Sequence, residues 1–351
     1  GTCSAMPKYV DVVFNIPVDR AFTYAVDDEA ACNLGQRVKA SFRGRKLTGF
    51  VVGETQDRPD GSYTVKKIEK ITDDVPVFGT MELDLADWLS RLYFCSKGEA
   101  LSIILPGGIR KSRIQEELIE KDLPGRELVL SEEQQHAVSR ICSGNANRFY
   151  LHGLTGSGKT EVYLSAAEQF LDRGKGVIYL VPEIALTHQI VDHVRNRFGE
   201  KTAVLHSRLT ASQRMEEWKR IRKGEAVFAI GARSAVFAPV NDLGLIIIDE
   251  EHESSYKSGS HPRYHARQVA MYRSSREGAI MVMGSATPSL EAYHLMKEGK
   301  IEEVPLTKRL AGGKMPALRI VDLKREENSI SKVLAEKIDG TFLEASESTI
   351  S

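Results

Sequence analysis

The most constraining feature of this sequence is an alternation of short apolar runs with helical segments, which begins at Leu130. The apolar runs are RFYLHG (148–153), VIYLV (177–181), TAVLH (202–206), AVFAI (226–230), LGLIIID (243–249) and AIMVM (279–283). Between them lie helical segments at 159–172, 187–198 and 210–223. Continuous apolar strands joined by helices are typical of a parallel sheet covered on both faces. We therefore predict an α/β lobe over residues 130–322.

The first part of the chain has a different pattern. Its short β-type runs are YVDVVFNI, FTYAV, QRVKASF, KLTGFVVGE and VKKIEKI, separated by turn signals between Tyr9 and Thr72. Runs of this kind predict a small β-rich domain. Apolar residues at helical spacing predict a helix around Thr80–Cys95, and LPGG at 105–108 interrupts the pattern. We place the β-rich domain at 6–105, a charged linker at 106–129 and a C-terminal tail at 323–351, and we exclude residues 1–5 as a leader left from cloning.

Composition narrows the class of protein. The 351 residues are 42% hydrophobic and 27% charged, which is enough for a proper core. Lys plus Arg and Asp plus Glu are both 48, which argues against a uniformly basic surface but leaves local patches open. The four cysteines form no C-x-x-C pair, so we expect reduced thiols in a cytoplasmic protein and no zinc site. We see no signal peptide and no apolar stretch long enough to cross a bilayer.

A glycine-rich loop follows the first apolar run of the lobe. GLTGSGKT (153–160) fits the pattern G-x-x-x-x-G-K-[ST], between a predicted strand and a predicted helix. Glycines let several backbone N–H groups point at phosphates from a helix N-terminus, where Lys159 can reach the β- and γ-phosphates and the Thr160 hydroxyl can hold Mg²⁺. The predicted ATP-binding residues of this loop are Gly153, Thr155, Gly156, Ser157, Gly158, Lys159 and Thr160.

An acidic box lies at the end of the buried strand 243–249. The run DEEH (249–252) places Asp249 where a carboxylate is costly unless a cation compensates it. In P-loop ATPases an aspartate at this place holds Mg²⁺. Glu250 is then placed to orient or deprotonate the attacking water. We predict Lys159, Asp249 and Glu250 as the catalytic residues, with Thr160 and Asp249 as the metal ligands.

These motifs together resemble superfamily 2 helicases. GLTGSGKT, VPEIALT (181–187), LHSRL (205–209), GARS (231–234), DEEH and GSATPS (284–289) occur in the order found in that superfamily. GSGKTEVYL (156–164), HESSYK (252–257) and RYHAR (263–267) are more specifically similar to the primosomal N′ family of bacterial replication-restart helicases. The resemblance covers nearly everything from Met6 to about Leu323. It implies a RecA-like lobe of an ATP-driven 3′-to-5′ DNA helicase that uses ATP and Mg²⁺ to restart stalled forks and assemble the primosome.

The resemblance also assigns roles to single residues. Gln134 matches a glutamine that reads the adenine edge, for which an amide offers both a donor and an acceptor. Ser285 and Thr287 match the motif that joins the ATP site to the DNA site, and His252 is implied in the same coupling. By residue type alone, Ser285 and Thr287 also fit a capped strand-to-helix turn, and His252 fits an ordinary packed histidine.

Two regions are candidates for DNA contact. Basic residues gather in the β-rich domain, and those that we assign to DNA are Arg43, Arg45, Lys46 and Lys66. A solvated basic face is the alternative. The domain resembles one that binds the 3′ end of the nascent leading strand, with Phe22 and Lys66 at its pocket positions. The chain has Thr23 where some members carry an acid, and a core role remains open for Phe22.

The second DNA candidate is the loop from Glu253 to about Arg267. Aromatic residues interleaved with cations suit base stacking and backbone contacts, and we assign Tyr256, Lys257, Arg263 and Tyr264 to DNA. Its likeness to an aromatic-rich loop of the family implies a sensor that joins DNA occupancy to hydrolysis. Arg233 in GARS is a further candidate for a backbone contact.

Other parts of the family are not recognised in the sequence. These are a winged-helix domain, for which 109–129 is too short, and the second lobe with its zinc cysteines and arginine finger. We expect a fragment or an engineered form with little or no unwinding activity. Full-length partners are expected to be a fork with a leading-strand 3′ end, other primosome proteins and single-stranded DNA-binding protein. A P-loop phosphotransferase and a DNA-binding module with a vestigial ATP site remain alternatives.

Overall fold

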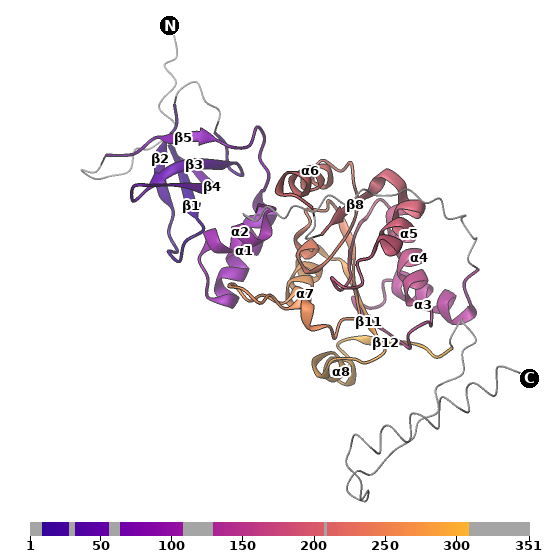
Figure 1. Cartoon of the computed structure of the whole chain (residues 1–351). Coiled ribbons are helices and arrows are strands. Elements are labelled where there is room, and N and C mark those ends of the chain that lie inside the picture. Colours follow the sequence, from indigo (N-terminus) through magenta and orange to yellow (C-terminus); the bar gives the residue numbers. More distant parts are fainter. Residues whose placement is uncertain (1–8, 28–31, 56–63, 108–128, 207–208, 309–351) are drawn as a thin grey trace, which may run out of the picture. The chain divides into compact units, whose positions relative to one another are not determined.

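The computed structural model describes residues 9–27, 32–55, 64–107, 129–206 and 209–308 (Figure 1). The predicted leader at 1–5, nearly all of the predicted linker and the tail at 323–351 lie outside these ranges. The described residues all belong to one compact unit, which ends at Leu310. Within them, no helix is both long and apolar enough to span a membrane.

The N-terminal residues form an antiparallel sheet, as the β-type runs predict. Its strands are β1 (Tyr9–Phe14), β2 (Phe22–Ala25), β3 (Arg37–Phe42), β4 (Arg45–Thr55) and β5 (Ile68–Ile71), in the order β2-β1-β4-β3-β5. The Ala25 amide donates to the Lys66 carbonyl at 2.9 Å, and Ala25 also bridges to Lys67. The two edges of the sheet therefore approach each other, and the sheet curls into a partial barrel.

Alternating residues of this sheet build its apolar core. Val10, Val12 and Phe14 of β1 are buried, and the Phe14, Phe22 and Phe42 rings pack against one another. A two-residue turn, Arg43-Gly44, joins β3 to β4, with φ angles of 47° and 77°. Positive φ at both positions is typical of the type I′ turn that matches the twist of a hairpin. The turn places the Arg43 side chain at the tip of the hairpin.

Two helices follow the sheet. The predicted helix is α1 (Thr80–Tyr93), and a second helix, α2 (Lys97–Ile104), was not predicted. The α2 helix begins at a capping box in which the Ser96 and Glu99 side chains bond to each other's backbone amides. Apolar residues of both helices belong to the same buried cluster as one face of the lobe. The Trp218 indole of the lobe donates to the Val77 carbonyl, just before α1, at 2.7 Å. The packing of this segment on the lobe therefore includes a hydrogen bond as well as apolar contacts.

The lobe contains a parallel sheet, which confirms the predicted α/β class. Its strands are β6 (Arg148–Gly153), β7 (Gly176–Leu180), β8 (Thr202–Leu205), β9 (Phe228–Gly231), β10 (Leu243–Asp249), β11 (Ile280–Ser285) and β12 (Glu302–Leu306). They lie in the order β12-β6-β11-β10-β7-β9-β8, and all the pairs are parallel. The first six match the apolar runs of the sequence, whereas β12 was not predicted, since its run EEVPL is short and carries two acids and a proline.

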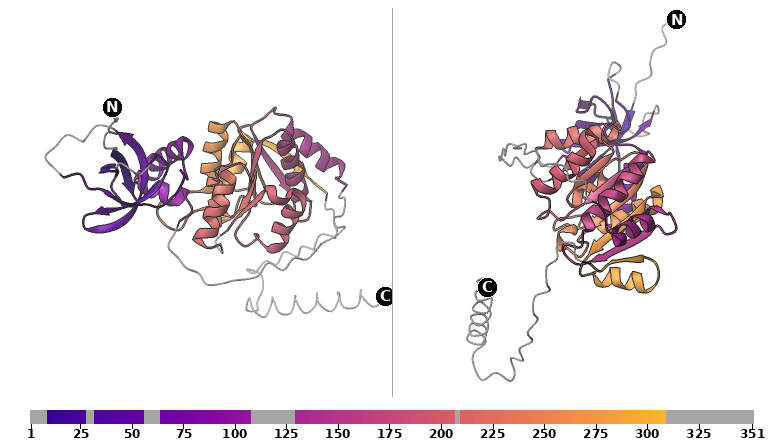
Figure 2. Two further views of the ribbon diagram at one scale, coloured as in Figure 1. Left: turned by 90° about the horizontal axis from the view of Figure 1, so that it is seen from above. Right: turned by 90° about the vertical axis from the view of Figure 1, so that its right-hand side faces the viewer.

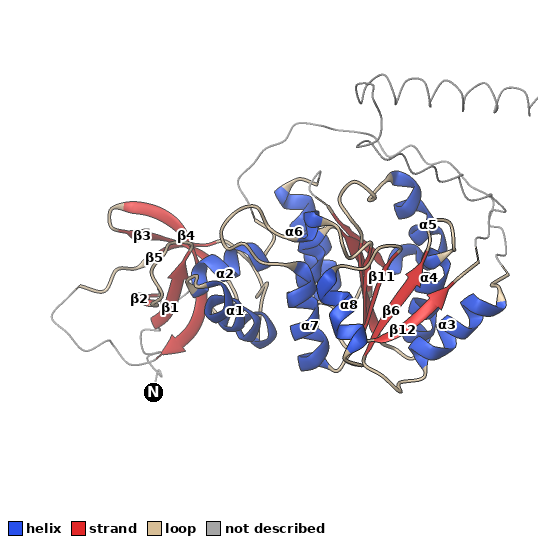
Figure 3. Ribbon diagram, turned by 90° about the horizontal axis from the view of Figure 1, so that it is seen from below, coloured by secondary structure: helices blue, strands red, loops and turns tan. Residues whose placement is uncertain are grey.

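Helices cover both faces of this sheet (Figures 2 and 3). On one face lie α3 (Glu132–Cys142), α4 (Lys159–Asp172) and α5 (His188–Phe198), and on the other α6 (Ala211–Arg222) and α7 (Ala266–Glu277). The remaining helix is α8 (Leu290–Lys297), and single 3₁₀ turns are η1 (Gly199–Lys201), η2 (Arg233–Phe237) and η3 (Ser254–Tyr256). Because both faces are covered, every β10 residue from Leu243 to Ile248 is buried, which explains its unbroken apolar run.

Candidate nucleotide and DNA site

The predicted nucleotide residues meet at the carboxyl edge of the parallel sheet. Strands β6, β11 and β10 are neighbours in the sheet, and they end at Gly153, Ser285 and Asp249. Since parallel strands all end at one edge, three motifs far apart in the sequence come together there. This edge is where ligands bind in open α/β sheets.

The glycine-rich loop has the backbone that a phosphate cradle requires. Gly158 is the N-cap of α4 and has a left-handed φ of 81°, which a side chain would strain. A Cβ atom at Gly153 would lie 2.6 Å from the Ser157 hydroxyl oxygen, so this close approach also needs glycine. No side chain caps the N-terminus of α4. Its first-turn N–H groups are therefore available to an anion.

Gln134 lies beside this loop, but its amide is already bonded within the protein. It is the N3 residue of the α3 capping box, where its Oε1 accepts from the Ser131 amide at 2.8 Å. Its Nε2 donates to the carbonyl of Gly158 at 3.1 Å, and the side chain is buried. The structure thus gives Gln134 a place next to the P-loop and a second task that the sequence did not indicate, which is to hold the loop backbone.

Lys159 links the P-loop to the acidic box. Its Nζ donates to the Gly153 carbonyl at 2.9 Å and lies 3.3 Å from Oε1 of Glu250. Glu250 itself has a left-handed φ of 44°, an unusual conformation for a residue with a side chain. The turn after β10 directs Glu250 toward Lys159 while Asp249 completes the strand. Strain of this kind is found at functional sites that the surrounding structure holds in place.

Asp249 lies in a site that favours a bound cation. Burial, reinforced by the charge of Glu250, raises the pKa of Asp249 from 3.8 to about 6, although Lys159 opposes the shift. The Tyr179 hydroxyl lies 3.5 Å from Oδ2 of Asp249 and beside the hydroxyl of Thr160. The two predicted metal ligands, Thr160 and Asp249, therefore share a neighbour.

These residues fit a nucleotide with a divalent cation. The helix N-terminus and Lys159 supply positive potential for phosphates, and the carboxylate and hydroxyl oxygens of Asp249 and Thr160 are ligands that Mg²⁺ prefers. A carboxyl group whose pKa is raised by burial and a like charge is the kind of group that a divalent cation would stabilise in its ionised form. The Ser157 hydroxyl is also buried without a hydrogen-bond partner in the protein.

The three residues predicted to couple the sites are in contact. Ser285 is fully buried, and its hydroxyl lies 2.6 Å from Nδ1 of His252 and 3.1 Å from Oε2 of Glu250. The amide of Thr287 donates to the same hydroxyl at 3.0 Å. The Ser285 hydroxyl therefore contacts both Glu250 and His252 of the acidic box, as well as the turn after β11.

The tyrosines of the loop after the acidic box do not offer stacking faces. Tyr256 is 1% exposed and Tyr264 is 4% exposed. The hydroxyl of Tyr256 donates to the carbonyls of Asp249 at 2.7 Å and Leu180 at 3.1 Å, and Tyr264 packs on Phe237. In this conformation the prediction that both rings stack on DNA bases is wrong, because the lobe itself covers them. Tyr256 instead attaches the loop to the carbonyl of Asp249, the predicted metal ligand.

The cations predicted for DNA in the same region divide into two kinds. Lys257 and Arg263 are exposed, as a phosphate contact requires. Arg233 is half-buried, and its guanidinium donates to the carbonyls of Ser255 at 3.0 Å and Lys257 at 2.7 Å and lies over the Tyr264 ring. Arg233 therefore holds the loop in this conformation through Nη1, while its Nε is buried without a hydrogen-bond partner.

The four basic residues of the β-rich domain that were predicted to contact DNA are all exposed, and two of them have contacts within the domain. Arg43 and Arg45 flank the hairpin turn, and the Arg43 guanidinium lies over the Phe42 ring. Lys46 pairs with Glu69 at 2.8 Å, an exposed contact that DNA can replace. Arg37, at the start of β3, is held by Asp73 at 2.7 Å and so stabilises the fold.

The predicted pocket residues Phe22 and Lys66 lie on segments that touch. Phe22 starts β2, and the Lys66 carbonyl bonds to Ala25 at the end of that strand. Phe22 is half-buried against the Phe42 ring, so both a core role and an exposed ring edge are compatible with its place. The hydroxyl of Thr23 donates to Asp11 Oδ1 at 2.7 Å, so an acid lies beside Thr23 on the neighbouring strand.

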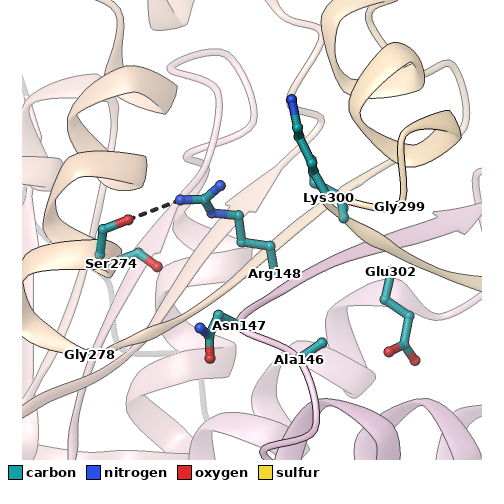
Figure 4. A pocket seen from close by; sticks show the side chains of 10 residues that line it. Ala146, Asn147, Arg148, Ser274, Gly278, Gly299, Lys300 and Glu302 are labelled. Atoms are coloured by element: carbon teal, nitrogen blue, oxygen red, sulfur yellow. Dashed lines mark hydrogen bonds between the residues drawn. The ribbon is translucent and has the colours of Figure 1, made fainter.

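A cavity of about 650 Å³ lies elsewhere in the lobe (Figure 4). Its lining comes from the start of β6, the end of α7 and the segment before β12, where Arg148 donates to the Ser275 hydroxyl at 2.9 Å. None of the predicted site residues lines it. It lies at the amino ends of the strands, away from the edge where the P-loop and the acidic box meet, and we do not regard it as the nucleotide site.

Sequence reasoning missed three site-related residues. Glu251 is fully buried next to the predicted catalytic residues, where it bonds to Arg267 and Ser289. All three lie within motifs that the sequence displays, which are DEEH, RYHAR and GSATPS. A third acid directly after the apolar strand and an arginine in the following loop were the available signals, but only the tertiary structure shows that Glu251 is buried and pairs with Arg267.

Comparison with known proteins agrees with this arrangement. A family model of the PriA 3′DNA-binding domain (3′BD) matches residues 11–106, and one of the DEAD/DEAH box helicase matches residues 131–295. The replication restart protein PriA of Treponema pallidum is 45% identical over 344 residues, which are 96% of this chain and 52% of that protein. PriA of Bacillus subtilis is 42% identical over 245 residues, 67% of this chain and 30% of that protein.

A relative with lower sequence identity matches as much of the chain. PriA of Borreliella burgdorferi is 32% identical over 350 residues, 97% of this chain and 53% of that protein. The chain spans about half the length of this relative and of the Treponema protein. The matches to both domain models and to nearly the whole chain place the sequence in one family. The chain belongs to the family of the replication restart protein PriA, of which it spans the 3′DNA-binding domain and the DEAD/DEAH box helicase domain.

Proposed function

We propose that this chain is the DNA-end-binding and ATP-binding part of a 3′-to-5′ DNA helicase that restarts replication forks. The observation that carries the proposal is the meeting of Lys159 with Glu250 at the carboxyl edge of the sheet. In this proposal ATP binds at the P-loop, and the family resemblance supplies the direction of movement and the role in primosome assembly. The protein would act in the cytoplasm.

The site residues divide the chemistry among them. The N–H groups of the first turn of α4 and the Lys159 ammonium would bind the phosphates, while Thr160 and Asp249 would hold Mg²⁺. Mg²⁺ held there would supply positive charge to the phosphate oxygens. Glu250 lies within ion-pair distance of Lys159 and would orient the attacking water and accept its proton. Gln134 holds the Gly158 carbonyl, and to read the adenine edge its buried amide would exchange its bonds to Ser131 and Gly158 for bonds to the base.

DNA binding is proposed for the exposed cations. Arg43, Arg45 and Lys46 on the β3–β4 hairpin and Lys66 beside β2 would hold the fork near a leading-strand 3′ end. Lys257 and Arg263 would contact the backbone of the strand at the lobe. Ser285, Thr287 and His252 would join DNA occupancy to the nucleotide site through the shared hydroxyl. Other primosome proteins and single-stranded DNA-binding protein are the proposed partners of the whole protein.

The experiment compares nucleotide and DNA binding on one preparation. Affinity for a fluorescent ATP analogue with Mg²⁺ is measured for the unaltered chain and for Lys159→Ala, and affinity for forks that end in a 3′-hydroxyl or a 3′-phosphate is measured beside it. We expect the Lys159→Ala chain to lose nucleotide affinity while it keeps fork affinity, and the 3′-hydroxyl fork to bind more tightly. Nucleotide binding unaffected by Lys159→Ala would contradict the site, and no fork binding would contradict the DNA role.

A further inference from the structure

Glu251 is the one residue of the acidic box to which the proposed chemistry gives no task. Its side chain is fully buried, yet its backbone is only one residue from Glu250. Its amide donates to the carbonyl of Gly284 at 3.1 Å, which attaches the box to β11. A buried carboxylate needs compensating donors.

Four groups from three elements supply those donors. Oε1 of Glu251 accepts from the Tyr150 hydroxyl at 3.0 Å and the Ser289 amide at 2.8 Å. Oε2 accepts from Arg267 Nη1 at 2.9 Å and from the Ser289 hydroxyl at 3.1 Å. Arg267 Nη1 also donates to the Ser289 hydroxyl at 2.7 Å, and the Arg267 side chain is only 8% exposed. Both carboxylate oxygens of Glu251 therefore accept two hydrogen bonds each, and Arg267 and Ser289 also bond to each other.

The positions of these residues define what the cluster joins. Arg267 is in the first turn of α7, at the end of the loop that leaves the acidic box, while Glu251 stands at its beginning. Ser289 is the N-cap of α8 and ends the turn that carries Ser285 and Thr287. Both ends of the loop and the end of the coupling turn are therefore fixed to one carboxylate.

We infer that Glu251 and Arg267 form a clamp that makes the loop 252–266 and the turn 285–289 move together, and so carries DNA occupancy to the nucleotide site. Glu251 and Arg267 are positioning residues in this view, because they act through Ser289 and the loop backbone. Without the clamp, a displacement of the exposed Lys257 or Arg263 would change the conformation of the loop alone and would not move the turn 285–289. With it, the displacement reaches the hydroxyl of Ser285 and hence Glu250.

This inference rests on the proposed function, and its test is the coupling between two ligands. The measured quantity is the ratio of the Kd values of a fluorescent ATP analogue with Mg²⁺, without and with a saturating forked oligonucleotide. Coupling of this kind changes affinity by about 5-fold to 150-fold in well-studied cases. We expect a ratio of at least about 5 for the unaltered chain, and a ratio within about 2-fold of unity for the double variant Glu251→Gln/Arg267→Gln.

The double variant leaves no buried charge unpaired, since Glu291, which lies 3.7 Å from Arg267 Nη2, is 70% exposed and stays solvated. A matched control exists on the same helix. Arg273 of α7 is 1% exposed and pairs with Glu277 at 2.6 Å, and its Nη1 donates to the carbonyls of Val236 and Ala238. Arg273→Gln/Glu277→Gln removes the pair of a buried arginine and a partly buried glutamate from α7, and this pair touches neither the acidic box nor the coupling turn. We expect this control to lose thermal stability but keep the ratio of the unaltered chain.

The outcomes distinguish failure of the clamp from failure of the proposed function. A normal ratio in folded Glu251→Gln/Arg267→Gln would overturn the clamp, and so would an equal loss of coupling in the Arg273→Gln/Glu277→Gln control. If the first double variant does not fold, Arg267→Lys is the replacement, because it keeps the charge but loses the guanidinium fork. We expect its ratio of Kd values to fall at least about 2-fold. An unchanged ratio would overturn the clamp. An unaltered chain that fails to bind either ligand would contradict the proposed function itself, whereas an unaltered chain that binds both with a ratio of unity would contradict the clamp alone.

Discussion

The ammonium nitrogen of Lys159 lies 3.3 Å from a carboxylate oxygen of Glu250. Ninety residues of sequence separate the P-loop lysine from the start of the acidic box (159 to 249), yet the two motifs form one ion pair. A phosphate that binds Lys159 must compete with Glu250, and its arrival would release this carboxylate. Nucleotide binding should therefore change the contacts of the acidic box as well as those of the P-loop.

Replacing Lys159 should weaken nucleotide binding without unfolding the chain. A hydrogen bond to a charged group contributes about 1.5–3 kcal/mol, so Lys159→Ala should lower the affinity for an ATP analogue by roughly 10- to 100-fold. Glu250 is 30% exposed, so water can solvate the carboxylate that loses its partner. Titration of the analogue together with thermal unfolding measures both effects. The exposed Lys175, replaced in the same way, should bind normally; equal losses in both variants would contradict the assignment.

Nucleotide binding should release a proton at mildly acid pH. The pKa of Asp249 is about 6 in the folded chain against 3.8 ordinarily, so the carboxyl is still half protonated near pH 6, and Mg²⁺ requires it ionised. Calorimetry in buffers of different ionisation enthalpy should therefore detect proton release near pH 6 that vanishes at pH 8. Asp249→Asn should abolish it. Release that persists unchanged in Asp249→Asn would have to come from another group.

The raised pKa of Asp249 also sets the direction of a stability change. Between about pH 4 and 6 the unfolded chain has ionised Asp249 while the folded chain still binds its proton, so stability falls as the pH rises through this window. The cost above pH 6 is at most about 3 kcal/mol, since a tenfold change in a protonation equilibrium corresponds to about 1.4 kcal/mol. Asp249→Asn should remove this part of the pH dependence and stabilise the chain at pH 7. Denaturant unfolding at pH 4, 5, 6 and 7 measures it, and parallel curves for both proteins would contradict it.

Neutralising the hairpin cations should reduce the salt dependence of DNA binding. Each phosphate contact contributes about 0.7–0.9 to the log–log slope, so Arg43→Ala/Arg45→Ala/Lys46→Ala should flatten the slope by about 2–3. Lys46 should contribute least, since it pairs with Glu69 in the free chain. The control removes three exposed cations of the lobe, Lys223, Arg276 and Lys297. An equal change in both triple variants would mean that net charge, and not the hairpin, determines the slope.

Removing the Tyr256 hydroxyl should cost stability but not DNA affinity. Tyr256→Phe leaves the Asp249 and Leu180 carbonyls without this donor, a loss of about 1–3 kcal/mol. Fork binding should stay within error, because the ring is buried. Denaturant unfolding and fork titration test the two statements. Tyr293→Phe, on a half-exposed ring of α8, is the control that should change neither. A large drop in fork affinity for Tyr256→Phe would restore this residue to the DNA surface.

The sequence by itself determined the class of both domains. Apolar runs such as LGLIIID appear as strands within a residue or two of their predicted ends, because a strand covered on both faces must be apolar throughout. The P-loop was equally readable, since a close approach at Gly153 and a left-handed φ at Gly158 both require glycine. The α2, α7, α8 and β12 elements were missed, because they are short or strongly polar and their formation depends on the surfaces they cover.

Only the tertiary structure decided which polar residues face each other. Residue type placed Tyr256, Tyr264 and Arg233 on a DNA surface, whereas the fold covers both rings and uses the arginine to hold a loop. The same fold turns Glu251 inward to Arg267 and Glu250 outward to Lys159, although the two glutamates are adjacent in sequence. The physical reason is that pattern and propensity act over a few residues, whereas the partner of a charge is set by strands and helices that converge from distant parts of the chain.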